Sequence, residues 1–378
     1  MTTTPGIAAG SAGLPHVPPP TGLRRVAIER FAPVLRRLED EGQYLFGAPV
    51  MAVEVLSVEA RPFSEVARVR VSTGSRAVLA FVKMFRLKDD APRHLAMMRE
   101  RIERDFETSL RVSTALASVE GCAAVRPLAC LPEHLALVTE EAGGETLSAL
   151  LERRLSWRDP AAAADMEPVF ERVGRWLNVF QACQPVGGEM TTEAILAYLE
   201  VRLRRLGGFR SAFDDRCQQR VVEHVRSLVA QLAPQDLQER AVHGDFALGN
   251  VLVDGERVTV LDFAMASRGL RLHDLAHAWL QLDLLCAKPK FRPSAVRRLH
   301  AALLRGYDPT LETAHPLFRL LVLQHVLTHL TASYRREEPW WTRPYSAWVR
   351  RRHWQWLASG VPGLADNLHR RPGAERTP

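Results

Sequence analysis

Three oxygen-bearing side chains occur close together in the second half of the chain. Asn250 lies five residues after Asp245, and Asp262 follows two short strand-like runs at 250–253 and 258–261. Phosphoryl transfer from ATP needs a carboxylate beside the attacking hydroxyl and oxygen ligands for Mg²⁺, and kinases supply them in this order and at this spacing. One amide, one carboxylate and phosphate oxygens suffice for Mg²⁺, which keeps several of its waters. The segment therefore predicts a phosphotransfer site.

A second candidate lies in the first half of the chain. Lys83 is one of only four lysines and sits inside the apolar run 77–85, which is predicted to be a strand. A kinase needs such a cation to hold the α- and β-phosphates of ATP, and it usually pairs with a glutamate on a helix. Glu107, and after it Glu103, are the candidate partners because both lie on one face of the next predicted helix. The sequence alone does not separate the two.

Two further segments are candidates for nucleotide contacts. The turn 61–64 (RPFS) has no glycine, so its backbone N–H groups cannot approach phosphates as a Gly-rich loop does. We expect Ser64 to donate its hydroxyl instead, with an ordinary turn as the alternative. Thr139, Glu140 and Glu141 end a later apolar run, and by position they are predicted to form the interlobe hinge that meets adenine.

The string HGD at 243–245 with Asn250, LDF at 261–263 and RLHDLA at 271–276 resembles the catalytic motif of the aminoglycoside phosphotransferase and choline kinase superfamily. Homoserine kinases share this motif, and the superfamily has a protein-kinase-like fold. Protein kinases usually carry HRD and DFG, whereas this chain has HGD and DFA, which favours the small-molecule branch. The resemblance covers roughly 50–290 and is strongest at 241–277.

The resemblance also implies roles for individual residues. Asp245 would orient or deprotonate the acceptor hydroxyl, and Asn250 and Asp262 would hold Mg²⁺. His243 would pack beneath the catalytic loop, and Asp274 would brace that loop from the next helix. The implied activity is an ATP-dependent transfer of phosphate to an alcohol group.

Two other functions remain open at this point. A pseudokinase would bind nucleotide without turnover; the missing glycine loop favours it, whereas the complete set of Lys83, Asp245, Asn250 and Asp262 argues against it. A metal-dependent phosphohydrolase would leave Lys83 and Asn250 unexplained. Its ligands would be His243, Asp245, Asp262, His273, Asp274 and His277.

The elements that must position these residues follow a two-lobed plan. An amphipathic helix at 23–38 precedes three strands, a long charged helix at 92–118 and two more strands. Helical periodicity dominates from 146 onward. We therefore predict an α+β, protein-kinase-like fold with a small antiparallel sheet carrying one helix, followed by a mainly helical lobe. The predicted strands are 51–58, 65–72, 77–85, 123–130 and 134–140. The predicted units are a flexible tail at 1–20, a nucleotide-binding lobe at 21–141, a catalytic and substrate lobe at 142–362 and a flexible tail at 363–378.

Composition excludes several classes of protein. The 378 residues are 47% hydrophobic, and no apolar run approaches the roughly 18–20 residues that cross a bilayer. Five scattered cysteines without a CxxC pair fit reduced thiols, and the first twenty residues do not look like a signal peptide, so we expect a cytoplasmic protein. The net charge of +7 comes almost entirely from arginine, which suggests compositional bias rather than nucleic-acid binding.

The acceptor is constrained only by charge. The segment 290–360 is strongly basic, which favours a neutral or anionic small molecule, such as a sugar or a glycolipid precursor, over a cationic one. The same region is rich in tryptophan at helical spacing, which is more typical of a core, although peripheral contact with a membrane is the alternative. These tryptophans are Trp340, Trp341, Trp348, Trp354 and Trp356.

Overall fold

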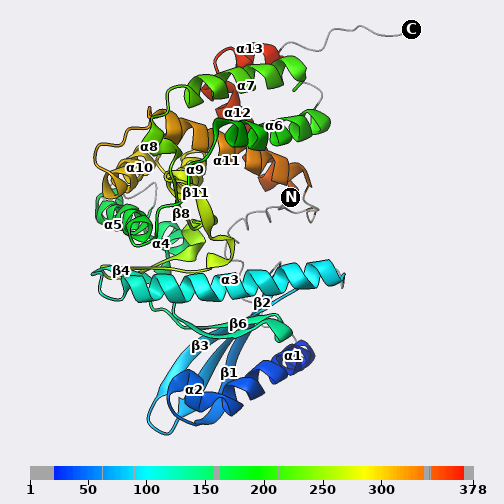
Figure 1. Ribbon diagram of the computed structural model, residues 1–378, viewed down its shortest axis with the longest axis vertical. Helices are drawn as coiled ribbons and strands as arrows, with labels where there is room; N and C mark the ends of the chain where they lie inside the picture. Colours follow the sequence, from blue (N-terminus) through cyan, green and yellow to red (C-terminus); the bar gives the residue numbers. More distant parts are fainter. Residues whose placement is uncertain are drawn as a thin grey trace.

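The computed structural model describes residues 21–61, 63–87, 91–155, 162–210, 213–335, 340 and 342–369, and it has the predicted two lobes (Figure 1). The tail expected at 1–20, Trp341, and residues 370–378 of the tail expected at 363–378 lie outside the described residues. In the described ranges, no helix is long and apolar enough to cross a membrane. The α+β class predicted from the sequence is confirmed.

The N-terminal lobe is built on a five-stranded antiparallel sheet in the order β1-β2-β3-β6-β5. Side chains alternate between its faces, as strand geometry requires. Val78, Ala80 and Val82 are buried in the core that also contains residues of α1, whereas Phe81 and Lys83 face the other way and stay partly exposed. The strands are β1 (Val50–Ala60), β2 (Ser64–Thr73), β3 (Ala77–Phe85), β5 (Pro127–Leu131) and β6 (Ala136–Glu140), covered by α1 (Thr21–Asp40) and α2 (Gly42–Phe46).

Helix α3 (Pro92–Leu116) crosses the molecule between the two lobes (Figure 1). Its buried residues recur at three- and four-residue spacing, which places them on one face. They are Ile102, Asp105, Thr108, Ser109, Val112 and Leu116. The helix packs on β5 and on the short 3-10 helix η3 (Phe263–Met265), so it contacts both lobes.

A second sheet joins the lobes and corrects one prediction. The run 123–130 is not one strand: β4 (Cys122–Ala124) ends before Arg126, and β5 begins at Pro127. β4 pairs in parallel with β10 (Arg257–Val260), which is followed by β9 (Val251–Asp254) and β7 (Glu145–Thr146). The indole Nε1–H of Trp176 also donates to the carbonyl oxygen of Ala123 at 2.7 Å. The two lobes are therefore connected through a shared sheet as well as through the hinge.

The C-terminal lobe packs helices around one large core that includes Trp176, Phe246 and Phe263. α5 and α10 approach so closely that a Cβ at Gly174 or Gly306 would collide with the backbone of the other helix. The helices are α4 (Leu147–Arg154), α5 (Ala162–Ala182), α6 (Thr192–Phe209), α7 (Asp215–Val229), α8 (Pro234–Leu237), α9 (His273–Cys286), α10 (Pro293–Tyr307), α11 (Pro316–Arg335), α12 (Arg343–Gly360) and α13 (Leu364–His369). The remaining short elements are η1 (Pro132–His134), β8 (Glu239–Val242), η2 (Leu248–Asn250) and β11 (Ser267–Leu270).

The end of the chain differs from the expected tail. Residues 364–369 form α13, and Leu364 is fully buried against the lobe, so the folded part extends beyond 362. The tryptophans of this region differ in burial. Trp354 is buried in the core, whereas Trp340 is 73% exposed. The tryptophan spacing thus reflects core packing in part only.

Candidate active site

The predicted catalytic residues lie on the loop between β8 and β9 and on the turn after β10. Val242 ends β8, which pairs with β11, and Asn250 ends the 3-10 turn η2 immediately before β9. The N–H of Leu261 donates to the carbonyl oxygen of Asn250 at 2.9 Å. This hydrogen bond holds the residue before Asp262 against the end of the catalytic loop, so two separate sequence motifs form one site.

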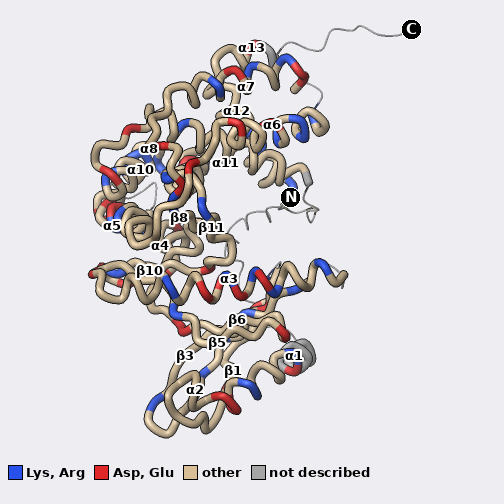
Figure 2. Tube along the Cα trace, in the orientation of Figure 1, with Lys and Arg blue, Asp and Glu red and all other residues tan. Residues whose placement is uncertain are grey.

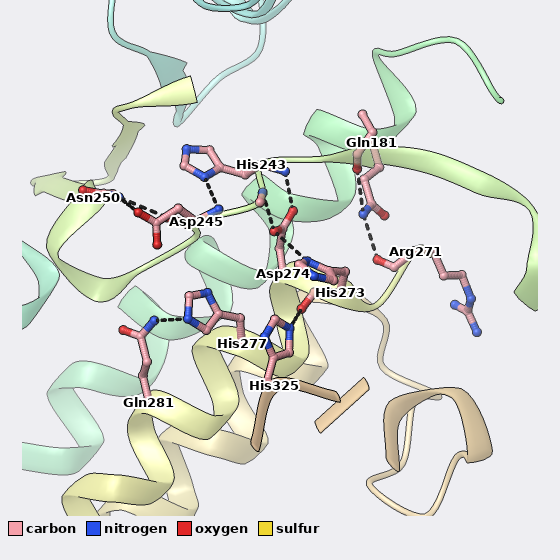
Figure 3. Close-up of polar contacts among 12 residues, drawn as sticks. Gln181, His243, Asp245, Asn250, Arg271, His273, Asp274, His277, Gln281 and His325 are labelled. Carbon is pink, nitrogen blue, oxygen red and sulfur yellow. Dashed lines mark hydrogen bonds and ion pairs between the residues drawn. The ribbon is translucent and has the colours of Figure 1, made fainter. Parts of the chain in front are cut away.

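Asp274 holds the start of this loop from the first turn of α9 (Figure 3). Its two carboxylate oxygens accept hydrogen bonds from the backbone N–H groups of His243, at 2.6 Å, and Gly244, at 3.0 Å. Burial alone would raise the pKa of Asp274, but the contacts from His273 and His243 outweigh it and lower the pKa. Asp274 therefore stays a carboxylate, as its bracing role requires.

His243 lies beneath the catalytic loop. Its side chain is fully buried against the rings of Phe246 and Phe263. Its Nε2 lies 2.9 Å from the carbonyl oxygen of Leu261, which can only accept, and its Nδ1 lies 3.3 Å from the N–H of Asp245, which can only donate. The Nε2–H tautomer satisfies both partners, and the ring links the catalytic loop to the segment before Asp262.

Gly244 has a conformation that only glycine adopts easily here. Its φ is +79°, and a Cβ at this position would collide with the carbonyl oxygen of Met265. The close approach lets the loop lie directly on η3. The middle position of the HGD sequence therefore requires glycine, because a side chain between His243 and Asp245 would push the catalytic loop away from η3.

Asp245 and Asn250 are joined within the loop (Figure 3). The Nδ2 of Asn250 donates to the carbonyl oxygen of Asp245 at 3.0 Å and approaches its Oδ2 at 3.5 Å. Because the amide nitrogen faces Asp245, the amide oxygen of Asn250 remains available as a ligand. Burial, and then the negative charge of Asp262, raise the pKa of Asp245. A carboxylate with a raised pKa is better suited to accept a proton than a fully solvated one.

Asp262 connects the two lobes. Its Oδ2 lies 2.7 Å from the Nζ of Lys83 on β3. Burial would raise the pKa of Asp262, but the charge and hydrogen bond of Lys83 hold it below its usual value. Asp262 also has a φ of +64°, which is unusual for a residue other than glycine and is found mainly where a site requires it. The predicted lysine therefore reaches the predicted metal ligand.

The structure does not bring either expected glutamate to Lys83. Glu103 and Glu107 are both exposed, among the charged residues that line α3 in Figure 2, and within the described chain neither forms an ion pair with Lys83. The acidic residue on the buried face is Asp105, which is 1% exposed and accepts a hydrogen bond from Ser109. Burial, followed by the charge of Asp262, raises the pKa of Asp105 to about 7, while Lys83 acts in the opposite direction.

Two residues of α3 were thus missed by sequence reasoning. Asp105 shares a helical stripe with Ile102 and Ser109, and this spacing could have identified it as the acid that faces inward. Arg101, one turn earlier, has a buried Nε without a partner among the described residues. It shares a face of α3 with Asp105, four residues later, and its positive charge lowers the pKa of both Asp245 and Asp262.

The remaining nucleotide candidates lie on, or directly after, the two strands that flank β3, which are β2 and β6. Ser64 is buried at the start of β2, on the same face of the sheet as Lys83 because it is two residues from Val66, the partner of Lys83. The N–H groups of Glu140 and Glu141 already donate to Arg126 and Leu79. The side chain of Glu141 pairs with Arg68 at 2.8 Å. A surface pocket of about 410 Å³ adjoins these hinge residues and is lined by Arg76, Ala77, Val78, Leu79, Glu140, Glu141 and Gly143.

The six ligands considered for a metallophosphohydrolase do not converge on one centre. His243 makes two hydrogen bonds to backbone groups, and Asp274 accepts from two. The ring of His277 contacts Gln281 (Figure 3) and stacks on His325 of α11. The donors suited to Mg²⁺ are instead the oxygens of Asp262 and Asn250, which are hard ligands as this ion prefers.

Comparison with known proteins agrees with this arrangement. The model of a phosphotransferase enzyme family matches residues 79–317, which is more than half of the chain. That range begins within β3 and ends at the start of α11, so it includes Lys83 and both motifs of the site. A search of curated proteins found no significant match.

Solved structures show the same fold at low sequence identity. A choline/ethanolamine kinase family protein from Mesorhizobium loti is 16% identical with a TM-score of 0.51, and the match covers 89% of this chain and 98% of that one. A thermostable mutant of aminoglycoside phosphotransferase APH(4)-Ia, in a ternary complex with ADP and hygromycin B, is 16% identical with a TM-score of 0.52, and the match covers 86% and 99% of the two chains.

Proposed function

The chain belongs to the phosphotransferase enzyme family, and on this basis we propose that it transfers the γ-phosphate of Mg²⁺-ATP to a hydroxyl group of a small molecule. The observation that carries the proposal is the 2.7 Å pair between Lys83 and Asp262. It brings a cation from the N-terminal sheet to the acidic motif of the other lobe, which is the arrangement that ATP phosphates and a metal ion need between them. The structure similar to this chain that contains ADP and hygromycin B supports a site for both a nucleotide and a small molecule.

We assign the nucleotide to the groups that face the cleft from both lobes. Lys83 holds the α- and β-phosphates, and Ser64 lies on the same face of the sheet. Because the N–H groups of Glu140 and Glu141 are already used, we expect adenine to meet the next backbone groups, from Ala142 onward. Asp262 and the amide oxygen of Asn250 hold Mg²⁺, which when bound neutralises charge on the phosphates.

Asp105 replaces the expected glutamate as the acidic partner on α3. An aspartate is one methylene shorter than a glutamate, and Asp105 is buried beside both Lys83 and Asp262. When Asp262 is engaged with Mg²⁺, we expect Lys83 to lie between the phosphates and Asp105. The carboxylate Oδ2 of Asp105, which has no hydrogen-bond partner in the described part of the chain, then gains one.

Asp245 acts on the acceptor. Hydrogen bonds from Asn250 fix its position, and its raised pKa suits a group that accepts the hydroxyl proton as the phosphoryl group is transferred. For the acceptor we keep a neutral or anionic small molecule, such as a sugar or glycolipid precursor, since the residues of 290–360 are strongly basic. We do not expect nucleic acid as a substrate.

The test is a screen of hydroxyl compounds with ATP and Mg²⁺, read by release of ADP and by the mass of the phosphorylated product. Wild-type protein and the Asp245→Asn variant are compared for every compound. Transfer by the wild type that the variant lacks supports the proposal. ATP binding with no transfer to any class of hydroxyl compound supports the pseudokinase alternative, and no binding of ATP with Mg²⁺ overturns the proposal entirely.

A further inference from the structure

Five histidines gather beneath the catalytic loop, where α9, α11 and α12 meet. His273 and His277 come from α9, His325 and His329 lie one turn apart on α11, and His353 comes from α12. The rings of His277 and His325 are stacked at 4.8 Å, and those of His277 and His329 are perpendicular at 5.6 Å. None of these five side chains takes part in the phosphotransfer proposed above, apart from the contact of His273 with Asp274.

Hydrogen bonds determine which nitrogens of the α11 histidines carry a lone pair. The Nε2 of His325 lies 2.9 Å from the carbonyl oxygen of His273, so it donates and leaves Nδ1 as the free acceptor. The Nδ1 of His353 donates to the carbonyl oxygen of Val349, so its Nε2 accepts from the Nδ1 of His329 at 3.3 Å. This leaves the Nε2 of His329 buried and without a partner among the described residues.

Gln281 determines which nitrogen of His277 is left without a partner. The Oε1 of Gln281 accepts the N–H of Leu248 at 3.0 Å, so its amide nitrogen faces the Nε2 of His277, also at 3.0 Å (Figure 3). The Nδ1 of His277 is then buried without a hydrogen-bond partner in the described structure. A buried polar atom without a partner is costly and calls for an explanation.

We propose that His277, His325 and His329 form a binding site for a zinc-class transition metal ion, separate from the Mg²⁺ site. One ring nitrogen from each residue lies within 4.8 Å of the others. Tetrahedral Zn²⁺ with Zn–N distances of about 2.0–2.1 Å needs nitrogens about 3.3 Å apart, so the rings have to close by up to about 1.5 Å. Three imidazoles suit zinc, copper or nickel and not Mg²⁺, and the fourth position is left to water.

Protonation does not compete with the metal at neutral pH. Burial, followed by the charge of His273, lowers the pKa of His277 to about 4. Burial also lowers the pKa values of His325 and His329 well below their usual range. All three rings are therefore neutral, which is the form that binds a metal ion.

Gln281 connects this site to the catalytic loop. A metal on the Nδ1 of His277 requires the single ring proton to move to Nε2, which then needs an acceptor. The oxygen of Gln281 is the nearest one, but it already accepts the N–H of Leu248, which lies between Asp245 and Asn250. The metal site and the catalytic loop therefore both depend on the amide oxygen of Gln281.

This link gives a test that does not depend on any substrate. Full-length protein without a polyhistidine tag is titrated with Co²⁺ in excess Mg²⁺, and d–d absorption bands of a tetrahedral nitrogen site are recorded, followed by displacement with Zn²⁺. We expect one ion per chain. His329→Gln and His277→Gln should each weaken binding more than about 100-fold, beyond the 10–100-fold cost of losing an outer-shell partner.

Gln281→Glu should have the opposite effect and increase the affinity for the metal ion. A carboxylate accepts from both Leu248 and the Nε2–H of His277, which releases Nδ1 for the metal, so affinity should rise on the order of 10-fold. His300→Gln is the matched control, because His300 is a buried histidine that contacts Trp279 and not the cluster. If the histidine variants fail to fold, Gln281→Glu still decides the question.

Three results would overturn the proposal. The first is the absence of a tetrahedral Co²⁺ spectrum at one equivalent. The second is binding that Asp262→Asn abolishes and His329→Gln leaves unchanged, which would place the ion at the catalytic site. The third is equal affinity of the wild type and Gln281→Glu. The transfer assay is not used here, so failure of the phosphotransfer proposal would leave these outcomes readable.

Discussion

The Nζ of Lys83 lies 2.7 Å from the Oδ2 of Asp262, although 179 residues separate them in the chain. Lys83 belongs to the N-terminal sheet and Asp262 to the turn after β10, so this ion pair joins the two lobes. Both side chains are partly exposed, which keeps the pair open to exchange with a ligand. Its role is therefore tested by variants of each partner.

Replacement of Lys83 should reduce the stabilisation that Mg²⁺-ATP gives to the protein. Mg²⁺-ATP at a hundredfold excess over its dissociation constant should stabilise the wild type by about 2.7 kcal/mol, and Lys83→Ala should lose most of this gain. Lys290→Ala is the control, because Lys290 pairs with Glu152 on the surface. Thermal unfolding with and without Mg²⁺-ATP measures the effect. Equal ligand-induced shifts in both variants would contradict the role of Lys83.

Asp245→Asn and Asp262→Asn should have different effects on ATP binding. Asp245→Asn removes the proton acceptor but leaves the metal ligands, so ATP should bind while turnover falls by ~10²–10⁴-fold, the usual contribution of a general base. Asp262→Asn removes the anionic ligand and should weaken Mg²⁺-dependent ATP binding as well. Calorimetric titration with ATP, with and without Mg²⁺, distinguishes them. The assignment fails if both variants lose affinity to the same extent.

Asp105 should make stability depend on pH. Its pKa is raised to about 7 from 3.8, so between these values the native state binds more protons than the unfolded chain. Stability from this group is complete below pH 3.8 and is lost as pH rises toward 7 and beyond. Asp105→Asn, which imitates the protonated form, should therefore raise the melting temperature relative to wild type more at pH 8 than at pH 5, without Mg²⁺ or nucleotide.

The exposed acid Glu107, on the same helix, supplies the control for that measurement. Glu107→Gln should shift the melting temperature by the same small amount at both pH values. A pH-independent effect of Asp105→Asn would mean that Asp105 is not the acid buried next to Lys83 and Asp262.

Asp274→Asn should destabilise the catalytic loop. The carboxylate accepts from the N–H groups of both His243 and Gly244, and an amide offers only one acceptor and turns a donor toward the other N–H. Leaving a buried N–H unpaired costs about 1–3 kcal/mol. Urea unfolding of Asp274→Asn beside Asp254→Asn, an exposed position in the β9–β10 hairpin, measures the difference. Equal midpoints would show that Asp274 does not brace the loop.

The parts of the site that are local in sequence were predictable. Asp245 and Asn250 are joined by hydrogen bonds within one loop, so their spacing alone indicated a common role. Lys83 was identified because a lysine in an apolar strand is unusual in a chain with only four lysines. The roles assigned to these residues stay predictions until the variants are measured.

What depends on docking between elements was not predictable. Glu103 and Glu107 share a face of α3, but periodicity does not tell which face is turned inward until the helix is packed on η3. Asp105 takes the inner position instead. Likewise, the apolar run 123–130 looked like one strand because the pairing of β4 with β10 joins residues more than a hundred positions apart.

That pairing also sets where the molecule can be divided. β4 belongs by sequence to the first lobe, yet it forms an outer strand of the sheet of the second, next to β10. A fragment starting at the hinge, near 142, would leave the backbone N–H and C=O groups of β10 unpaired along one edge. Such an edge can pair with a strand of another chain and lead to aggregation. A fragment starting before Cys122 would keep that edge covered. For anyone expressing the catalytic half alone, the useful border therefore lies inside the nucleotide-binding half.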